Sequence, residues 1–412
     1  MNKRLLISLI IGAILIALTL IAIKFANGYR IDLKNKGLKE TGLLVADSDP
    51  EGAQVFIDGK LASATDDTLN LPPGEYQITI KKDGYNSWEK KLNIEKSLVA
   101  ETNALLFPSV PNLTPLTYIG AQNPTPSPDG QKIAFIVSQA SSAEKNGLYI
   151  LDLANRALNF RSESRQISTN LDNFDFQTSQ LTWSPDANQI IASGNEANLL
   201  LNANGFNQPA NITDVTARLP VILAEWQETL AKKQTERLKL LPEFMLYTAT
   251  ASAKNLYWSP DEEKLLYTAT ASAQIPESLV TPLPASNTQP EQRQLEPGNI
   301  YVYDLKEDRN FLLAQTEAIE ASPSNQLQEF SQQYSPFLTQ NIQWFPSSRH
   351  LIKTNTDRIT IVEYDNTNEV TIYSGPFEKH FAYPWPNGSQ LVILTTLGQE
   401  NSPTNLYAIN LK

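Results

Sequence analysis

The chain has 412 residues, too many for one ordinary domain, so we expect two or three domains. Its formal net charge of −11 argues against a nucleic-acid partner, because binding a phosphate backbone calls for a basic face. It has no cysteine and only two histidines, His350 and His380, which excludes disulfides and leaves little for a histidine-based zinc site.

The first element is an apolar stretch, residues 5–23, which contains no charge and follows Lys3 and Arg4. At about 1.5 Å per residue, a helix of this length spans about 28 Å, close to the hydrocarbon thickness of a bilayer. A cleaved signal peptide has a shorter apolar region and a small-x-small exit, which residues 24–26 fit poorly. We therefore predict a transmembrane anchor over 1–27, with cleavage as the alternative, and a polar linker over 28–40. The anchor would be a single pass in the cell membrane, with the later domains extracytoplasmic.

Short alternating strands separated by turns fill the next segment, 41–107. Residues 54–57 end at Asp58 and Gly59, a hairpin signal because both positions tolerate positive φ. Residues 75–80 and 87–94 follow as further strands, each preceded by a glycine-containing turn. Several short strands in so few residues predict a small antiparallel β-sandwich.

The turns of this segment also have a recognisable order. Residues 49–53, 55–60, 71–76 and 82–85 with Trp88 resemble a PEGA domain, and the resemblance covers the whole segment. One departure is the connection at 62–67, where the family often has a Gly-x-Thr-Pro stretch. The resemblance implies an envelope-associated module. We expect its motif residues to shape turns rather than contact a ligand; they are Pro50, Glu51, Gly52, Ala53, Asp58 and Gly59.

A phrase recurs five times after residue 120, each time just before a short apolar run. It reads Trp-Ser-Pro-Asp in its clearest copies and is centred on Pro128, Pro185, Pro260, Pro346 and Pro386. The last two prolines are 40 residues apart, about the length of one β-propeller blade. Proline presets φ, Asp or Asn caps the turn, and the tryptophan would pack between neighbouring blades. We assign to these turns Pro128, Asp129, Gly130, Trp183, Pro185, Asp186, Trp258, Pro260, Asp261, Trp344 and Pro346.

Each phrase is paired with a later strand, such as 148–153 or 299–305, that ends in Asp-Leu or a similar pair. This pairing resembles the TolB-type propeller, or WD40-like Pro-Asp repeat, over residues 112–412. The resemblance implies a ring, and we expect the stretch 115–120 to join the last blade and close it. The predicted fold class is all-β: an N-terminal transmembrane helix, a small antiparallel β-sandwich, then a β-propeller of about five or six blades with a helical insertion.

Two insertions interrupt the repeats. Residues 214–241 have a helical period, which predicts a helix packed on the flank of the repeats; the alternative is a lid or a partner-docking helix. Residues 274–298 are rich in Pro, Ser and Gln, which predicts a flexible loop. Between them, the sequence at 246–253 recurs at 266–273 and predicts two neighbouring strands. The helical stripe consists of Leu223, Trp226, Leu230, Leu238 and Leu241.

Catalytic signals are scarce, because Gly-x-Gly and Gly-x-Ser-x-Gly are both absent. We predict no catalytic, cofactor-binding or metal-binding residue, and therefore a protein that is not an enzyme. The predicted function is a membrane-anchored, extracytoplasmic binding or scaffold protein of a prokaryotic cell envelope. A propeller face would contact an envelope protein or a cell-wall polymer. The alternative is a propeller-based hydrolase acting on a glycan or peptide of the wall, because distant loops can assemble a carboxylate pair.

Overall fold

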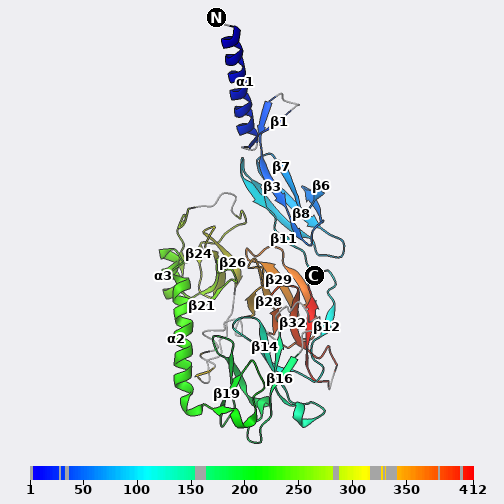
Figure 1. The fold of residues 1–412 in the computed structure, drawn as a ribbon, viewed down its shortest axis with the longest axis vertical. Coiled ribbons are helices and arrows are strands. Elements are labelled where there is room, and N and C mark those ends of the chain that lie inside the picture. Colours follow the sequence, from blue (N-terminus) through cyan, green and yellow to red (C-terminus); the bar gives the residue numbers. More distant parts are fainter. Residues whose placement is uncertain are drawn as a thin grey trace. The chain divides into compact units, whose positions relative to one another are not determined.

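A computed structural model of the chain describes residues 3–26, 29–32, 37–153, 164–281, 287–315, 326–327, 330, 341–378, 381–399 and 402–412 (Figure 1). The chain divides into two compact units. The first unit combines Met1–Leu106 with Thr281–Pro290, and the second combines Phe107–Val280 with Glu291–Lys412. The polypeptide therefore leaves the first unit, returns to it for ten residues, and leaves it again.

The first unit begins with helix α1 (Lys3–Ala26), followed by the paired strands β1 (Tyr29–Asp32) and β2 (Gly37–Glu40). No helix in the described part of the chain is long and apolar enough to cross a membrane. The predicted N-terminal transmembrane helix is therefore wrong.

The rest of the first unit consists of short strands around one apolar core. Two sheets have the strand orders β10-β3-β7 and β6-β5-β8-β9, and β4 pairs with β11. Alternate residues of β9 are buried, which is the pattern of a strand with one face toward a core. The pairs β3–β10 and β4–β11 are parallel, whereas the prediction was antiparallel throughout. The strands are β3 (Gly42–Ala46), β4 (Ser48–Asp49), β5 (Gln54–Ile57), β6 (Lys60–Ala64), β7 (Asp67–Leu71), β8 (Gly74–Lys81), β9 (Trp88–Ile94), β10 (Val99–Glu101) and β11 (Ala104–Leu105).

The second unit contains five four-stranded antiparallel sheets in its described part. The first has β13 (Gln122–Pro126), β14 (Lys132–Val137), β15 (Gly147–Asp152) and β16 (Ser164–Thr169). The second has β17 (Gln180–Trp183), β18 (Gln189–Ser193), β19 (Asn198–Asn202) and β20 (Thr213–Asp214). The third has β21 (Ala253–Trp258), β22 (Lys264–Ala269), β25 (Asn299–Asp304) and β26 (Arg309–Gln315). The fourth has β27 (Ile342–Trp344), β28 (His350–Thr354), β29 (Arg358–Glu363) and β30 (Val370–Ser374). The fifth has β31 (Ala382–Pro384), β32 (Gln390–Thr395), β33 (Asn405–Asn410) and β12 (Leu113–Pro115).

The strand that follows each Pro-Asp phrase is largely buried on both faces, because neighbouring sheets pack against each other. Every residue of β22 and of β25 is buried. Apolar clusters join the first sheet to the second, the first to the fifth, and the third to the fourth. The near-continuous apolar runs that follow each Pro-Asp phrase are explained by this two-sided burial.

The expected pairing of an early strand with the last sheet is present, slightly earlier in the chain than predicted. β12 pairs with β33, and the backbone N–H of Leu116 donates to the carbonyl of Leu406 at 2.8 Å. However, no closed barrel or propeller is found among the described residues. The predicted β-propeller of about five or six blades is therefore wrong as a closed ring. Between the second and third sheets, a pair of helices makes apolar contacts with each sheet.

These helices are α2 (Leu219–Leu238) and α3 (Glu243–Ala251). Near its start α2 buries Ile222, Leu223 and Trp226 in a cluster with Ile191 of the second sheet. The end of α2 and α3 pack in the cluster that holds Trp258 of the third sheet. Figure 1 shows α2 as a long green helix that runs from near β19 to α3 and β21. The predicted helix packed on the repeats is therefore found.

Two segments beside the helices differ from simple sequence expectations. Residues 246–253 were predicted as a strand, but most of this stretch belongs to α3, so the prediction of two neighbouring strands is wrong. Pro242 and Glu243 favour a helix start there. The segment 274–298 contains a short ladder of β23 (Ala273–Gln274) and β24 (Gln294–Leu295), with Ile275 and Leu295 fully buried.

A candidate binding cavity

All five Pro-Asp turns of the second unit have one backbone geometry. In each, the first residue of the turn donates its N–H to the carbonyl five residues later, at 2.8–2.9 Å. In each, the fourth residue has positive φ, between 57° and 72°. The donors are Ser127, Ser184, Ser259, Phe345 and Trp385, and the residues with positive φ are Gly130, Ala187, Glu262, Ser348 and Gly388.

The Ser-Pro-Asp sequence closes the turn with side chains. Ser184 Oγ donates to Asp186 Oδ1 at 2.6 Å and accepts from the N–H of Gln189 at 2.9 Å. The same Asp186 oxygen accepts from the N–H of Asn188 at 3.1 Å. Ser127 with Asp129, and Ser259 with Asp261, repeat these bonds. The Ser184 hydroxyl is the main reason that the pKa of Asp186 lies below its usual value.

The last two turns use other residues at the same positions. In the fifth turn Asn387 Oδ1 replaces the aspartate oxygen and accepts from the N–H and the hydroxyl of Ser389. Trp385 stands where the first three turns have serine, so it is not equivalent to Trp183, Trp258 or Trp344. In the fourth turn Ser347 bonds the buried ring of His350 at 2.9 Å, which gives that histidine a structural contact. His380 lies outside the described residues.

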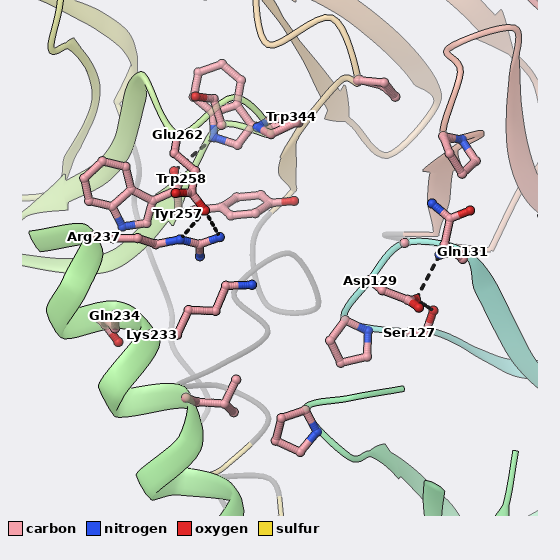
Figure 2. A pocket seen from close by; sticks show the side chains of 18 of the residues that line it. Ser127, Asp129, Gln131, Lys233, Gln234, Arg237, Tyr257, Trp258, Glu262 and Trp344 are labelled. Carbon is pink, nitrogen blue, oxygen red and sulfur yellow. Dashed lines mark hydrogen bonds and ion pairs between the residues drawn. The ribbon is translucent and has the colours of Figure 1, made fainter. Parts of the chain in front are cut away.

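The five turns converge on one cavity of about 730 Å³, shown in Figure 2. Pockets that hold small ligands commonly have this size. The ring of each turn proline lines the cavity, and so do Trp258 and Trp344. The five turn prolines are Pro128, Pro185, Pro260, Pro346 and Pro386. The repeated phrase thus brings parts of the chain that are far apart in sequence to one place.

One face of α2 forms the opposite wall. Thr229, Lys233 and Arg237 line the cavity at four-residue intervals, which places them on the same side of the helix. Arg237 donates through Nε and Nη2 to Glu262 Oε1 of the third turn, at 2.8 and 2.6 Å. Figure 2 shows the ammonium of Lys233 directed from α2 toward the turns. The wall therefore combines one internal ion pair with a second cation.

Two tyrosines that stand two residues before the first residue of a turn also line the cavity. Burial raises the pKa of Tyr257 to about 12. Burial also raises the pKa of Tyr383, where Tyr257 and then Asp129 add to the increase. The hydroxyl of Tyr383 lies beside Gly130, where an added Cβ would approach it to 3.2 Å. Both phenols are therefore neutral across the physiological pH range.

Several of these lining residues were not singled out from the sequence: Lys233, Arg237, Tyr257, Glu262 and Tyr383. Their signal was present. The two tyrosines stand two residues before the first residue of a turn, and the α2 residues follow a four-residue spacing beside the apolar stripe. That stripe is found: Leu223, Trp226 and Leu241 are buried, and Leu230 and Leu238 are half-buried.

The sequence motif of the first unit shapes turns. Gly52 and Gly59 have φ of 73° and 76°, and Asp58 has φ of 50°. Asp58 Oδ1 accepts from the N–H of Gln77 at 3.0 Å, and the N–H of buried Ala53 donates to Thr65 Oγ1 at 2.9 Å. The backbone carbonyl of Glu51, the residue after Pro50, accepts a hydrogen bond from Lys82 Nζ. These residues belong to the first unit, and the residues that line the cavity belong to the second.

Acidic and histidine side chains do not cluster in the described part of the chain: no group of three or more could hold a metal ion there. Two carboxylates line the cavity, Asp129 and Glu262. Asp129 is held by its own turn and Glu262 by Arg237. Neither carboxylate is therefore without a structural partner.

Comparison with known proteins identifies residues 41–108 as a match to the PEGA domain family. A search of the curated proteins found no match to the chain. The solved structures similar to this chain include TolB proteins and a β-propeller domain. A TolB from Agrobacterium tumefaciens is 15% identical, with 72% of this chain and 83% of that chain covered and a TM-score of 0.23. TolB from Acinetobacter baumannii is 11% identical. The match covers 82% of this chain and 60% of that chain, with a TM-score of 0.23.

A third similar structure is the β-propeller domain of Cps50 (Swd1) from Myceliophteria thermophila. It is 11% identical to this chain. The match covers 72% of this chain and 99% of that domain, with a TM-score of 0.23. At these TM-scores nothing further follows for this chain. The PEGA match confirms the family resemblance of the first unit.

Proposed function

We propose that this chain is an extracytoplasmic binding or scaffold protein of a prokaryotic cell envelope, and that the cavity at the five turns receives its partner. The PEGA match over 41–108 supports the assignment to the envelope. The partner is a protein or a cell-wall polymer.

The convergence of the five turns on one cavity carries the proposal. Its walls combine ring faces from tryptophan, tyrosine and proline with a few polar groups, which is the composition of ligand-binding pockets. Rigid turns hold these rings in place, because each turn is fixed by the same backbone bond. A binding site needs such pre-ordered surfaces, since ordering them on binding would weaken affinity.

A hydrolase of the wall is the weaker candidate. Glycoside cleavage needs two carboxylates free to act as acid and base or nucleophile. Asp129 and Glu262 each already accept hydrogen bonds that hold a turn or a helix in place. We therefore propose binding without catalysis.

A bulky residue in the cavity tests the proposal. Thr229 lines the cavity, whereas Thr235 lies on the same helix outside it, and both donate their hydroxyl to the carbonyl four residues earlier. The full-length chain is immobilised and exposed to solubilised envelope components. We expect Thr229→Trp to lose a component that the native chain and Thr235→Trp both retain. Equal retention by both variants, or no retention by the native chain, would contradict the proposal.

A further inference from the structure

The charge balance of α2 indicates what the cavity binds. Three of the four basic residues on α2 and the residue after it form ion pairs, but no ion pair of Lys233 is found among the described residues. Lys233 also projects toward the turns (Figure 2). The pairs are Lys232 with Glu228 at 2.7 Å, Arg237 with Glu262 at 2.6 Å, and Lys239 with Glu236 at 2.5 Å.

The acidic groups of the cavity already have bonding partners. Asp129 Oδ1 accepts from the hydroxyl of Ser127 at 2.5 Å and from the N–H of Gln131 at 3.0 Å. Glu262 Oε1 accepts two bonds from Arg237. A carboxylate in a partly enclosed site would gain a charge-assisted hydrogen bond from Lys233. The position opposite Lys233 is therefore suited to an incoming anion.

The remaining lining favours a peptide over a sugar. Sugar hydroxyls are usually bound by carboxylates, and the carboxylates here already have partners. Aromatic and proline rings pack well on extended peptide side chains, as aromatic-lined grooves do when they recognise peptides. Gln131 and Gln234 add amide groups that can bond a peptide backbone.

We propose that the cavity binds an extended peptide segment through a carboxylate that pairs with Lys233, while the neighbouring residues of the segment pack on the aromatic and proline rings. This inference rests on the proposed function, because it names the ligand class of the same cavity.

The test is calorimetric titration of the full-length chain with two blocked hexapeptides. One alternates proline with glutamate and the other alternates proline with glutamine, so they differ only in charge. Lys233→Gln removes the proposed contact. Lys232→Gln is the matched control, because Lys232 is a neighbour on the same helix that is paired with Glu228 and does not line the cavity. Trigalacturonate serves as a carboxylate-bearing sugar.

We expect the glutamate peptide to bind, and Lys233→Gln to weaken its binding about tenfold while Lys232→Gln stays close to the native chain. Binding should also weaken as the salt concentration rises. Equal binding of both peptides, or equal affinities of the two variants, would overturn the role of the carboxylate. If trigalacturonate binds and the peptide does not, or if no probe binds, the assignment of a peptide as the ligand is overturned.

These failures are separate from failure of the proposed function. The retention experiment with Thr229→Trp does not depend on the charge of the partner. If that variant loses an envelope component and the glutamate peptide fails, the cavity is a binding site for another chemical class. If Thr229→Trp loses nothing, the proposed function itself fails.

Discussion

The indole N–H of Trp183 donates to the backbone carbonyl of Thr125 at 2.9 Å and so joins two neighbouring sheets. Trp344 makes the corresponding bond to Tyr257 at 3.0 Å. Trp258 occupies the same place in the third turn, but its Nε1 has no partner in the described structure. Thr182, which corresponds to Thr125 and Tyr257, also has a buried hydroxyl without a partner. The missing bond falls at the junction where α2 and α3 pack between the second and third sheets.

Phenylalanine substitutions test this difference between the tryptophans. Trp183→Phe and Trp344→Phe each remove a hydrogen bond between two sheets, which costs about 1 kcal/mol beyond the loss of ring volume. Trp258→Phe loses similar volume but no bond, so we expect a smaller decrease in the free energy of unfolding. Urea unfolding followed by circular dichroism measures all three. A loss at Trp258 as large as at Trp183 would contradict the assignment.

Glycine is required at the fourth position of the fifth turn. Gly388 has φ of 69°, and an added Cβ would approach Phe345 Cζ to 3.0 Å. We expect Gly388→Ala to destabilise the protein by about 1–2 kcal/mol, because left-handed backbone is costly for residues with a Cβ. Gly205→Ala is the control, since nothing lies within 4 Å of its Cβ position. Thermal unfolding should separate the two; similar midpoints would argue against strain at Gly388.

The other turns show what offsets that strain. Ala187 is buried in the cluster between the first two sheets, Glu262 pairs with Arg237, and Ser348 Oγ accepts from the N–H of Asp261 at 3.0 Å. Each of these side chains makes a contact that glycine could not make. A left-handed residue other than glycine is therefore stable where its side chain has a partner.

The second turn should lose stability in acid. The hydroxyl of Ser184 holds the pKa of Asp186 below its usual value of 3.8. A lowered pKa in the folded state contributes stability above the unfolded value, and this contribution is lost as the pH falls through the folded pKa. We expect Asp186→Asn to unfold more easily than the native chain at about pH 6, with the difference disappearing below pH 3.8.

The fifth turn supplies the reverse variant. Asn387 occupies the position of the aspartate and bonds Ser389 in the same manner. In Asn387→Asp, the fifth turn should gain the loss of stability at low pH that the second turn no longer shows in Asp186→Asn. Urea unfolding at several pH values measures both, and a pH profile that neither substitution changes would rule out this role for the turn carboxylate.

The turns were predictable from sequence because their chemistry is local. Proline, the capping oxygen and the residue with positive φ stand within four positions, so the phrase alone specifies the bend. The octapeptide at 246–253 and 266–273 shows the opposite case. One copy lies mainly in α3 and the other begins in β22, so the same residues adopt two structures. Flanking residues and tertiary contacts decide between them.

The cavity was predictable only in part. The turn prolines followed from the repeat, but the opposite wall comes from an insertion whose packing the repeat does not specify. The helical period predicts which residues of α2 are buried. It does not predict which part of the chain lies across the cavity from its polar residues. The ion pair between Arg237 and Glu262 joins residues 25 positions apart, which no local pattern encodes.

The return of the chain to the first unit provides a last test. Gln289 is buried, and its Nε2 donates to the carbonyl of Lys91 in β9, the edge strand of its sheet, at 2.7 Å. Gln289→Ala removes this bond, which should cost about 1 kcal/mol and speed amide exchange in β9. Thr288→Ala is the control, because its exposed hydroxyl reaches the same carbonyl only at 3.5 Å. Hydrogen exchange followed by mass spectrometry compares the β9 peptides. Because an edge strand relies on such caps for its outer backbone groups, equal exchange in the two variants would mean that Gln289 does not hold β9 in place.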